Sequence, residues 1–293
     1  MRVILFLAAI TAFAADSPNW VTAAGGTAKL DPQGRIVELD LRSSWISDSD
    51  LPAIAALPAL ESLDLSLTRI TDRGLKPLKK ALRLKRLNLR FAELFTDEGM
   101  SMVRNLKQLR QIDLRGTKVT DTTLEYLAEL PLLESVDVGF AQITDNGIDS
   151  LGALPNLQRL TLGGNKLTDV GLQALRQLRS LQYLDLGGAQ RTDSGMWSIS
   201  MTDSGINAIA TLENLQELRL RGIAIASRHL EALKALPKLE RLSIQDCKRV
   251  GPEAISFLEG YSSLRLLDVA GSGLVPGNLD SLKTRLPKVT VVN

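Results

Sequence analysis

The chain has 293 residues, 55 of them Leu, against only 3 Trp, 3 Tyr and 6 Phe, and its net charge is +2. So much aliphatic side chain can bury a large core, which excludes a disordered chain. One Cys excludes a disulfide framework, and the absence of Lys/Arg blocks argues against a nucleic-acid-binding protein.

The N-terminus has the pattern of a secretory signal peptide. A basic start is followed by an apolar run over residues 3–10 and by small residues at Ala12 and Ala14. We place the cleavage after Ala14 rather than Ala15, so that residues 1–14 are the leader. The alternative is a buried N-terminal helix or strand of the fold. The leader predicts an exported protein, periplasmic or extracellular, and no later segment is long and apolar enough for membrane insertion.

Residues 15–35 are expected to form an N-terminal cap. We expect a short helix near Trp20 and then a hairpin, because residues 31–34, Asp-Pro-Gln-Gly, suit a type I turn.

A repeat organises the rest of the chain. Residues 60–65 have the pattern Leu-x-x-Leu-x-Leu, in which the last two Leu point to one face of a strand and the residues between them to the other. Copies begin at Ile36, Leu60, Leu84, Leu109, Leu133, Leu157, Leu181, Leu215, Leu239, Leu264 and Val289. The spacing is 24 or 25 residues, with a single interval of 34. A fixed period of this length is typical of a solenoid.

A helix follows each strand. In residues 68–78 the apolar spacing changes from that of a strand to that of a helix. The pair Thr71-Asp72 can accept hydrogen bonds from the first helical N–H groups. The Thr-Asp pair recurs at 96–97, 120–121, 144–145, 168–169 and 192–193. Pro77 lies inside a predicted helix, so that helix should start late or bend.

The pattern LxxLxLxxTxIT-D-x-GLxxLxxL resembles the leucine-rich repeat family, over residues 36–293. The resemblance is greatest to bacterial exported arrays and to the cysteine-containing or ribonuclease-inhibitor-like subtype. It implies one right-handed α/β solenoid, a horseshoe of about ten 24-residue repeats, with a parallel sheet on the concave face and helices on the convex face. Residues 36–286 would form the repeat domain and residues 287–293 a C-terminal strand cap.

The interval of 34 residues contains a duplication. Thr-Asp-Ser-Gly at 192–195 recurs at 202–205, and the second copy is in register with the neighbouring helices. We therefore expect an insertion at residues 191–200. The first copy, with Met196, Trp197, Ile199 and Met201, should bulge from the strand-to-helix edge, where Trp197 could contact a ligand.

Catalytic chemistry is not indicated. The sequence lacks HExxH, GxSxG, GxGxxG and P-loop motifs. His229 is interpreted as a surface residue beside a helix cap, and Cys247, at the ninth position of its repeat, as a buried structural thiol. A row of Asp residues along the strands could bind a cation, but interleaved Arg side chains favour a structural role. We predict no enzyme activity, no cofactor and no metal.

The strand residues that point away from the helices form the candidate binding face. Arg clusters flank a strip of glycines with Phe140 and Tyr183, and Arg and Tyr are frequent among residues that dominate interfaces. The alternative is that the glycines only ease packing. The predicted ligand contacts are Arg86, Arg90, Arg115, Phe140, Arg159, Tyr183, Arg219, Arg221 and Arg241.

The predicted function is non-catalytic recognition of a protein or peptide by a monomer. A peptide with acidic ends and an apolar middle would complement the face. Two other functions stay open. One is a substrate-receptor or effector role like that of F-box-type repeat proteins, and the other is glycan or cell-wall binding through Phe91, Phe140, Tyr183 and Trp197.

Overall fold

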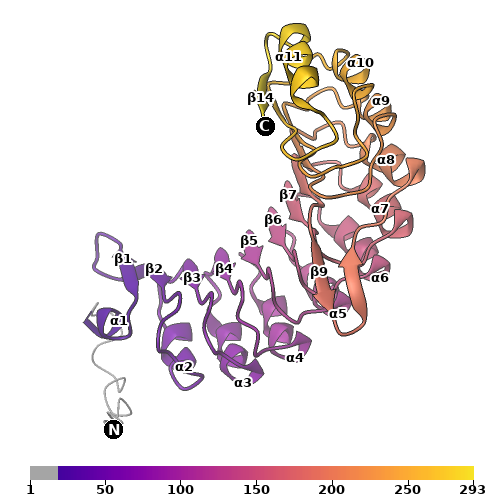
Figure 1. Ribbon diagram of the computed structural model, residues 1–293. Coiled ribbons are helices and arrows are strands. Elements are labelled where there is room, and N and C mark those ends of the chain that lie inside the picture. Colours follow the sequence, from indigo (N-terminus) through magenta and orange to yellow (C-terminus); the bar gives the residue numbers. More distant parts are fainter. Residues whose placement is uncertain (1–18) are drawn as a thin grey trace. The chain divides into compact units, whose positions relative to one another are not determined.

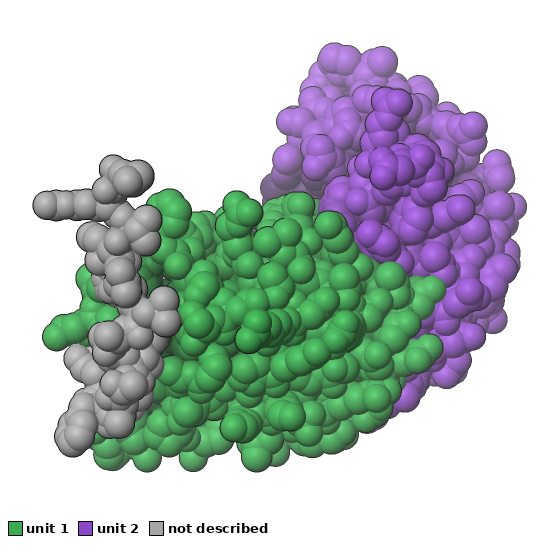
Figure 2. Space-filling view, turned by 90° about the horizontal axis from the view of Figure 1, so that it is seen from below, with its two compact units in different colours: residues 1–133 green, residues 134–293 purple. Residues whose placement is uncertain are grey.

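The computed structural model describes residues 19–293, which form two compact units with the boundary after Leu133 (Figure 2). The predicted signal peptide, residues 1–14, lies outside the described residues. Each unit is an α/β array in which short parallel strands alternate with short helices (Figure 1).

Unit 1 begins with an antiparallel pair and continues as a parallel sheet. Helix α1 (Asn19–Ala23) precedes β1 (Thr27–Leu30), which pairs antiparallel with β2 (Ile36–Asp40). The parallel strands follow in chain order, β2, β3 (Ser62–Asp64), β4 (Arg86–Asn88) and β5 (Gln111–Asp113). The helical segments between them are α2 (Leu51–Ala55), α3 (Asp72–Leu75), η1 (Lys76–Lys80), α4 (Asp97–Met100), η2 (Ser101–Asn105) and α5 (Asp121–Leu127), where η marks a 3₁₀-helix.

Unit 2 repeats the arrangement with one interruption. Its parallel strands lie in the order β6 (Ser135–Asp137), β7 (Arg159–Thr161), β8 (Tyr183–Asp185), β11 (Glu217–Arg219), β12 (Arg241–Ser243), β13 (Leu266–Asp268) and β14 (Thr290–Val292). The helical segments are α6 (Asp145–Ile148), η3 (Asp149–Ala153), α7 (Asp169–Ala174), η4 (Leu175–Gln177), α8 (Asp203–Ile209), α9 (His229–Leu233), α10 (Ala254–Leu258) and α11 (Pro276–Arg285). Between β8 and α8, strands β9 (Ala189–Thr192) and β10 (Gly195–Ser198) form a separate antiparallel hairpin.

The core lies between strands and helices. In the parallel strands from β2 to β13, the central residue (Leu39 in β2), such as Leu87 or Leu160, is at most 2% exposed. The same holds for the aliphatic residue directly after each of these strands, such as Leu89 or Leu162. Strand residues on either side of the central one point to the opposite face, which we call the open face. Pro77 lies in η1, directly after α3, so the helix continues past it as a tighter turn.

Hydrogen bonds between repeats connect the starts of the helices. The Asp that begins one helix accepts from the Thr that precedes the next helix at Asp72, Asp97, Asp145 and Asp169. Asp145, for example, accepts from the backbone N–H of Thr168 at 2.8 Å and from its hydroxyl at 2.6 Å. The same carboxylate accepts from the N–H of Gly171 at 3.0 Å. A Cβ at Gly171 would lie 2.5 Å from an oxygen of Asp145, which explains why the position carries Gly. Thr168 also caps its own helix by accepting from Val170.

The hairpin spans residues 189–198, two residues earlier than the insertion expected from the duplicated motif. Ser200 donates its N–H to the carbonyl of Leu167 at 2.8 Å, which repeats the bond from Lys166 to Ile143. Ile199 and Met201 are buried, so the expectation that they bulge outward was wrong for these two residues. The duplicated motif locates the insertion only from sequence identity. The hydrogen bond that Ser200 donates to Leu167 shows that the regular repeat resumes by residue 200.

Candidate binding surface

The Asp row on the open face has a structural role. Each carboxylate or carboxamide accepts a backbone N–H two residues later, at 2.8 to 3.1 Å, where the strand ends. The acceptors are Asp40, Asp64, Asn88, Asp113, Asp137, Asp185 and Asp268. Burial raises the pKa of Asp113, which opposes a role as a charged metal ligand. Residues 19–293 contain no group of three or more His, Cys, Asp or Glu side chains placed to hold a metal ion.

Each of these turns continues into left-handed backbone. The third residue after every strand from β2 to β13 in the parallel array has a positive φ between 54° and 108°. Half of these residues are Gly, which adopts this region at no steric cost. The positions are Ser43, Leu67, Phe91, Gly116, Phe140, Gly164, Gly188, Gly222, Asp246 and Gly271.

An arginine–tyrosine stack lies at the centre of the open face of unit 2. Tyr183 on β8 is only 8% exposed, because the guanidinium of Arg159 lies 4.0 Å and that of Arg219 5.3 Å from its ring centroid. The two Arg residues come from the strands on either side of Tyr183. Burial and the charge of Asp185 raise the pKa of Tyr183 to about 12, so its hydroxyl stays protonated. The ring itself is therefore covered, and the guanidinium groups form the surface.

Glu217 holds two cations beside this stack. One carboxylate oxygen lies 2.7 Å from Arg219 and the other 2.6 Å from Arg241. Burial alone would raise the pKa of Glu217, but the hydrogen bonds and charges of Arg241 and Arg219 outweigh it and hold the pKa below its usual range. Arg221 is paired with Asp246 at 3.4 Å. Arg159, in contrast, has no ion-pair partner in residues 19–293 and is exposed.

The glycine strip is not an open track for a ligand. A Cβ at Gly164 would lie 2.7 Å from the ring of Phe140, and one at Gly188 would lie 2.8 Å from it, so this ring covers both glycines. A Cβ at Gly163 would lie 1.9 Å from the carbonyl oxygen of Gly187. The glycines thus allow close packing of neighbouring turns and of Phe140, which supports the packing interpretation.

The other sequence-predicted contacts are distributed over the two units. In unit 1, Arg86 is held by Glu38 at 2.8 Å, Arg90 lies 5.1 Å from the ring of Phe91, and Arg115 is half-buried. Trp197 on β10 is half-buried and donates its indole N–H to Ser194 within the hairpin.

Two residues singled out from the sequence have structural roles. Cys247 is buried and donates to the carbonyl of Leu220 at 3.1 Å, as expected of a structural thiol. His229 is 5% exposed, not a surface residue as expected. Its Nδ1 accepts the N–H of Ala226, and its Nε2 lies 2.7 Å from a carboxylate oxygen of Asp203. His229 takes the place that Gly171 has opposite Asp145, and no sequence signal distinguishes this from a surface position.

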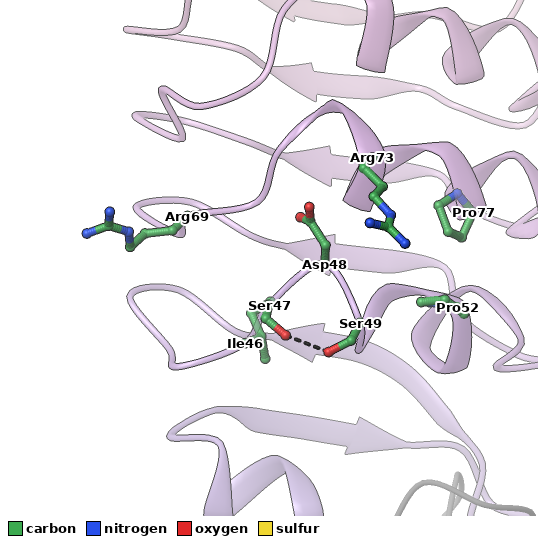
Figure 3. Close-up of a pocket in the computed structure, with 8 residues that line it drawn as sticks. All are labelled: Ile46, Ser47, Asp48, Ser49, Pro52, Arg69, Arg73 and Pro77. Carbon is green, nitrogen blue, oxygen red and sulfur yellow. Dashed lines mark hydrogen bonds between the residues drawn. The ribbon is translucent and has the colours of Figure 1, made fainter. Parts of the chain in front are cut away.

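Unit 1 has a hollow of about 700 Å³ between the segments at 46–52 and 69–77. Figure 3 shows Arg69 and Arg73 at its rim pointing away from each other. The carboxylate of Asp48 is already used by the N–H of Thr71 at 2.9 Å. The hydroxyls of Ser47 and Ser49 bind each other at 2.7 Å. These groups do not converge on a ligand.

Comparisons with known proteins agree with the repeat pattern. Two family models, both described as leucine-rich repeat, match residues 131–190 and 57–79. An internalin from Listeria monocytogenes has a similar structure, with a TM-score of 0.62 and 23% identity over 83% of this chain and 70% of its own. The mouse RP105/MD-1 complex matches with a TM-score of 0.56 and 21% identity, over 82% of this chain and 44% of the mouse chain. No curated protein has significant sequence similarity.

These matches support a leucine-rich repeat family, and the fold is that of a leucine-rich repeat solenoid with an open sheet. At these identities the structural likeness speaks for the fold alone. No enzyme family is indicated by the matches. Among the described helices, none has the length and apolar character needed to cross a membrane.

Proposed function

We propose that the protein is a non-catalytic recognition protein that binds an acidic segment of a protein or peptide on the open face of unit 2. The observation that carries the proposal is that the guanidinium of Arg159 is exposed and has no carboxylate partner in the described chain. Its neighbours Arg219, Arg241 and Arg221 are each paired with a carboxylate, whereas Arg159 is stacked on Tyr183 and has no ion-pair partner in the described chain.

Stacking suits Arg159 to bind an acidic group. Contact with the ring fixes the plane of the guanidinium and leaves its N–H groups free at the edge, where a carboxylate can bind with two parallel hydrogen bonds. Because Arg159 and Arg219 both lie within 5.3 Å of one ring centroid, their guanidinium groups are close enough to contact a single short segment.

The ligand we propose differs from the first expectation in its middle part. Phe140 covers the glycines that were to accept an apolar segment, so acidic groups dominate the proposed recognition. Stacking of a sugar on Tyr183 is disfavoured, because Arg159 and Arg219 occupy its faces. Arg86, Arg90 and Arg115, on the open face of unit 1, remain proposed ligand contacts.

The proposal includes the setting inferred from the sequence. With a leader at residues 1–14, the protein would act as an exported monomer, in the periplasm or outside the cell, similar to bacterial exported arrays of the cysteine-containing subtype. It would need neither a cofactor nor a nucleic-acid partner.

A photo-crosslinking residue tests the proposal in the native cells. Placed at Ser135, the register neighbour of Arg159 on β6, it should attach to a protein segment rich in Asp or Glu. At Arg176, which is exposed on the helical side, it should give no such product. The segment identified by mass spectrometry is then synthesised, and its affinity is measured by calorimetry.

Arg159→Met should weaken that affinity at least about tenfold, because it removes the equivalent of about one charge-assisted hydrogen bond. Arg176→Met should leave the affinity unchanged. Attachment only at the helical side, or equal affinity of the Arg159→Met variant, would contradict the proposed face.

A further inference from the structure

Unit 1 carries a row of exposed apolar side chains outside the open face. Trp45 is 92% exposed, Leu67 52%, Phe91 38% and Leu94 46%. They lie in the segments that follow β2, β3 and β4, before the next helix begins (Figure 1). We call these four residues the apolar ridge.

Backbone hydrogen bonds place the ridge on neighbouring turns. Ser43 donates to the carbonyl of Ser66, Leu67 to Arg90 at 2.8 Å, and Phe91 to Arg115 at 2.8 Å. The turns are therefore spaced like adjacent strands, about 4.8 Å apart. Leu67 and Phe91 each lie three residues after their strand and are therefore neighbours on adjacent turns, whereas Trp45 and Leu94 lie five and six residues after theirs. The four exposed side chains thus come from three consecutive turns of unit 1.

The fold does not explain an apolar residue at Leu67, whereas the ring of Phe91 packs over Gly116 as that of Phe140 packs over Gly164. Leu67 has a φ of 58° and Phe91 a φ of 54°, a region that is unfavourable for bulky side chains. Elsewhere in the two units the equivalent position is mostly Gly, Ser or Asp, which fit it better. Leu67 gains little burial in return. A strained, exposed apolar side chain of this kind points to a role in binding.

Unpaired cations lie on the ridge turns and on the turn after β5. Arg69, Arg90 and Lys118 make no ion pair in residues 19–293, and Arg90 lies 5.1 Å from the ring of Phe91. Glu93 is the sole acidic residue in the segments 43–47, 67–70, 91–95 and 116–119. A partner that covers the ridge therefore gains from negative charge beside its apolar contacts.

We propose that the apolar ridge is a docking surface for a partner protein, and that it binds a segment of Asp or Glu mixed with large apolar side chains. The orientation of Phe91 favours a protein over a lipid surface. A Cβ at Gly116 would lie 2.2 Å from its ring, so the ring lies flat along the neighbouring turn and does not project. Trp, Phe and Arg are enriched where proteins meet. This surface is separate from the Arg159 face and is argued independently of it.

A library of random dodecapeptides displayed on phage tests the proposal on the full chain. It is selected on the wild type and on the variant Trp45→Ser/Leu67→Asn. Asn accepts a positive φ more readily than Leu, so the variant removes two ridge side chains while relieving the backbone. It should melt no lower than the wild type, which separates lost binding from lost folding. Val170→Ser is the matched control, since Val170 is 71% exposed on α7 in unit 2.

Peptides enriched on the wild type should combine Asp or Glu with Leu, Phe or Trp. Synthesised and measured by fluorescence anisotropy, they should bind the Val170→Ser variant as they bind the wild type, and Trp45→Ser/Leu67→Asn at least about tenfold more weakly. Arg159→Met should not affect them. Absence of enriched peptides, or equal binding to the double variant, overturns the proposal. So does binding to vesicles of phosphatidylcholine and phosphatidylglycerol that the double variant loses, which would identify a lipid surface instead.

Discussion

Asp169 and Thr202 are joined by the same pair of hydrogen bonds as Asp145 and Thr168, although 33 residues separate the first two and 23 the second two. Asp169 accepts the N–H of Thr202 at 2.9 Å, and Asp145 that of Thr168 at 2.8 Å. The extra residues therefore lie outside the repeat, and they are the hairpin at 189–198.

Deletion of residues 189–198 should leave the fold intact. It joins Gly188 to Ile199 and restores the sequence Leu-Gly-Gly-x-x-x-Thr-Asp that begins at Leu162. Because Ile199 and Met201 keep their buried positions, we expect the free energy of unfolding to change by less than about 1 kcal/mol. Urea unfolding followed by circular dichroism measures it.

The deletion of residues 191–200 is the matched control. It has the same length and period but places Ala189 where Ile199 is buried. The loss of this apolar side chain should cost about 2 kcal/mol or more. If the two deletions are equally stable, Ile199 does not belong to the core as the structure places it.

The bonds between Thr-Asp pairs should contribute measurably to stability. Asp169→Ala leaves the N–H groups of Thr202 and Gly205 without their acceptor. We expect a loss of about 1–2 kcal/mol in urea unfolding. Asp193→Ala is the control, because Asp193 has the same sequence context but lies exposed in the hairpin turn. Equal effects of the two changes would argue that the bonds add nothing.

The same carboxylate should make stability depend on acid. Burial raises the pKa of Asp169, but hydrogen bonds from Thr202 and Gly205 outweigh it and hold the pKa below the usual 3.8. Because the pKa is lower in the folded state, the ionised carboxylate stabilises the fold above about pH 4. This stabilisation is lost as the pH falls through the folded-state pKa. Between pH 5 and pH 2, the wild type should lose more stability than Asp169→Ala. Parallel curves for the two proteins would contradict this.

The repeat unit could be predicted because its signal is periodic. Leu63 and Leu65 alternate with polar residues, and the same alternation recurs in each repeat, so the strand face and the helix were readable from spacing. The hydrogen bonds that Thr168 donates to Asp145 could not be predicted, since Thr168 already serves as a helix cap within its own repeat. The sequence motif is the same whether Asp145 faces water or the next repeat.

The candidate site was harder to predict than the fold. Tyr183 and Arg159 were identified as residues of one face, but the stacking that buries Tyr183 depends on side-chain orientation across three strands. Gly164 and Gly188 suggested an open strip because the sequence does not reveal that the ring of Phe140, from a neighbouring turn, covers them.

Gly188 should be the more sensitive of two glycines in left-handed backbone. Gly188 has a φ of 108° and Gly222 a φ of 72°, but a Cβ at Gly188 would lie 2.8 Å from Phe140 whereas one at Gly222 meets nothing within 4 Å. Gly222→Ala should cost about 1 kcal/mol from the backbone alone, and Gly188→Ala about 1 kcal/mol more. In a Phe140→Ala background, the difference in stability loss between Gly188→Ala and Gly222→Ala should shrink, as measured by urea unfolding. If that difference is unchanged, its cause is the backbone conformation and not the contact with Phe140.

Cys247 should react with thiol reagents only when unit 2 opens. Its side chain is 0% exposed and donates to the carbonyl of Leu220, and burial raises the pKa of the thiol to about 11. At pH 8 both the accessibility of the thiol and the fraction of reactive thiolate are therefore low.

The reagent dithionitrobenzoate should release no colour from the native protein, and one equivalent of its coloured product from the protein unfolded in guanidinium. The urea dependence of the reaction should follow that of the circular dichroism. Cys247→Thr, which copies the residue found at Thr68 and Thr117, controls for background colour. Rapid reaction of the native wild type would mean that the turn after β12 opens locally, which its buried hydrogen bond argues against.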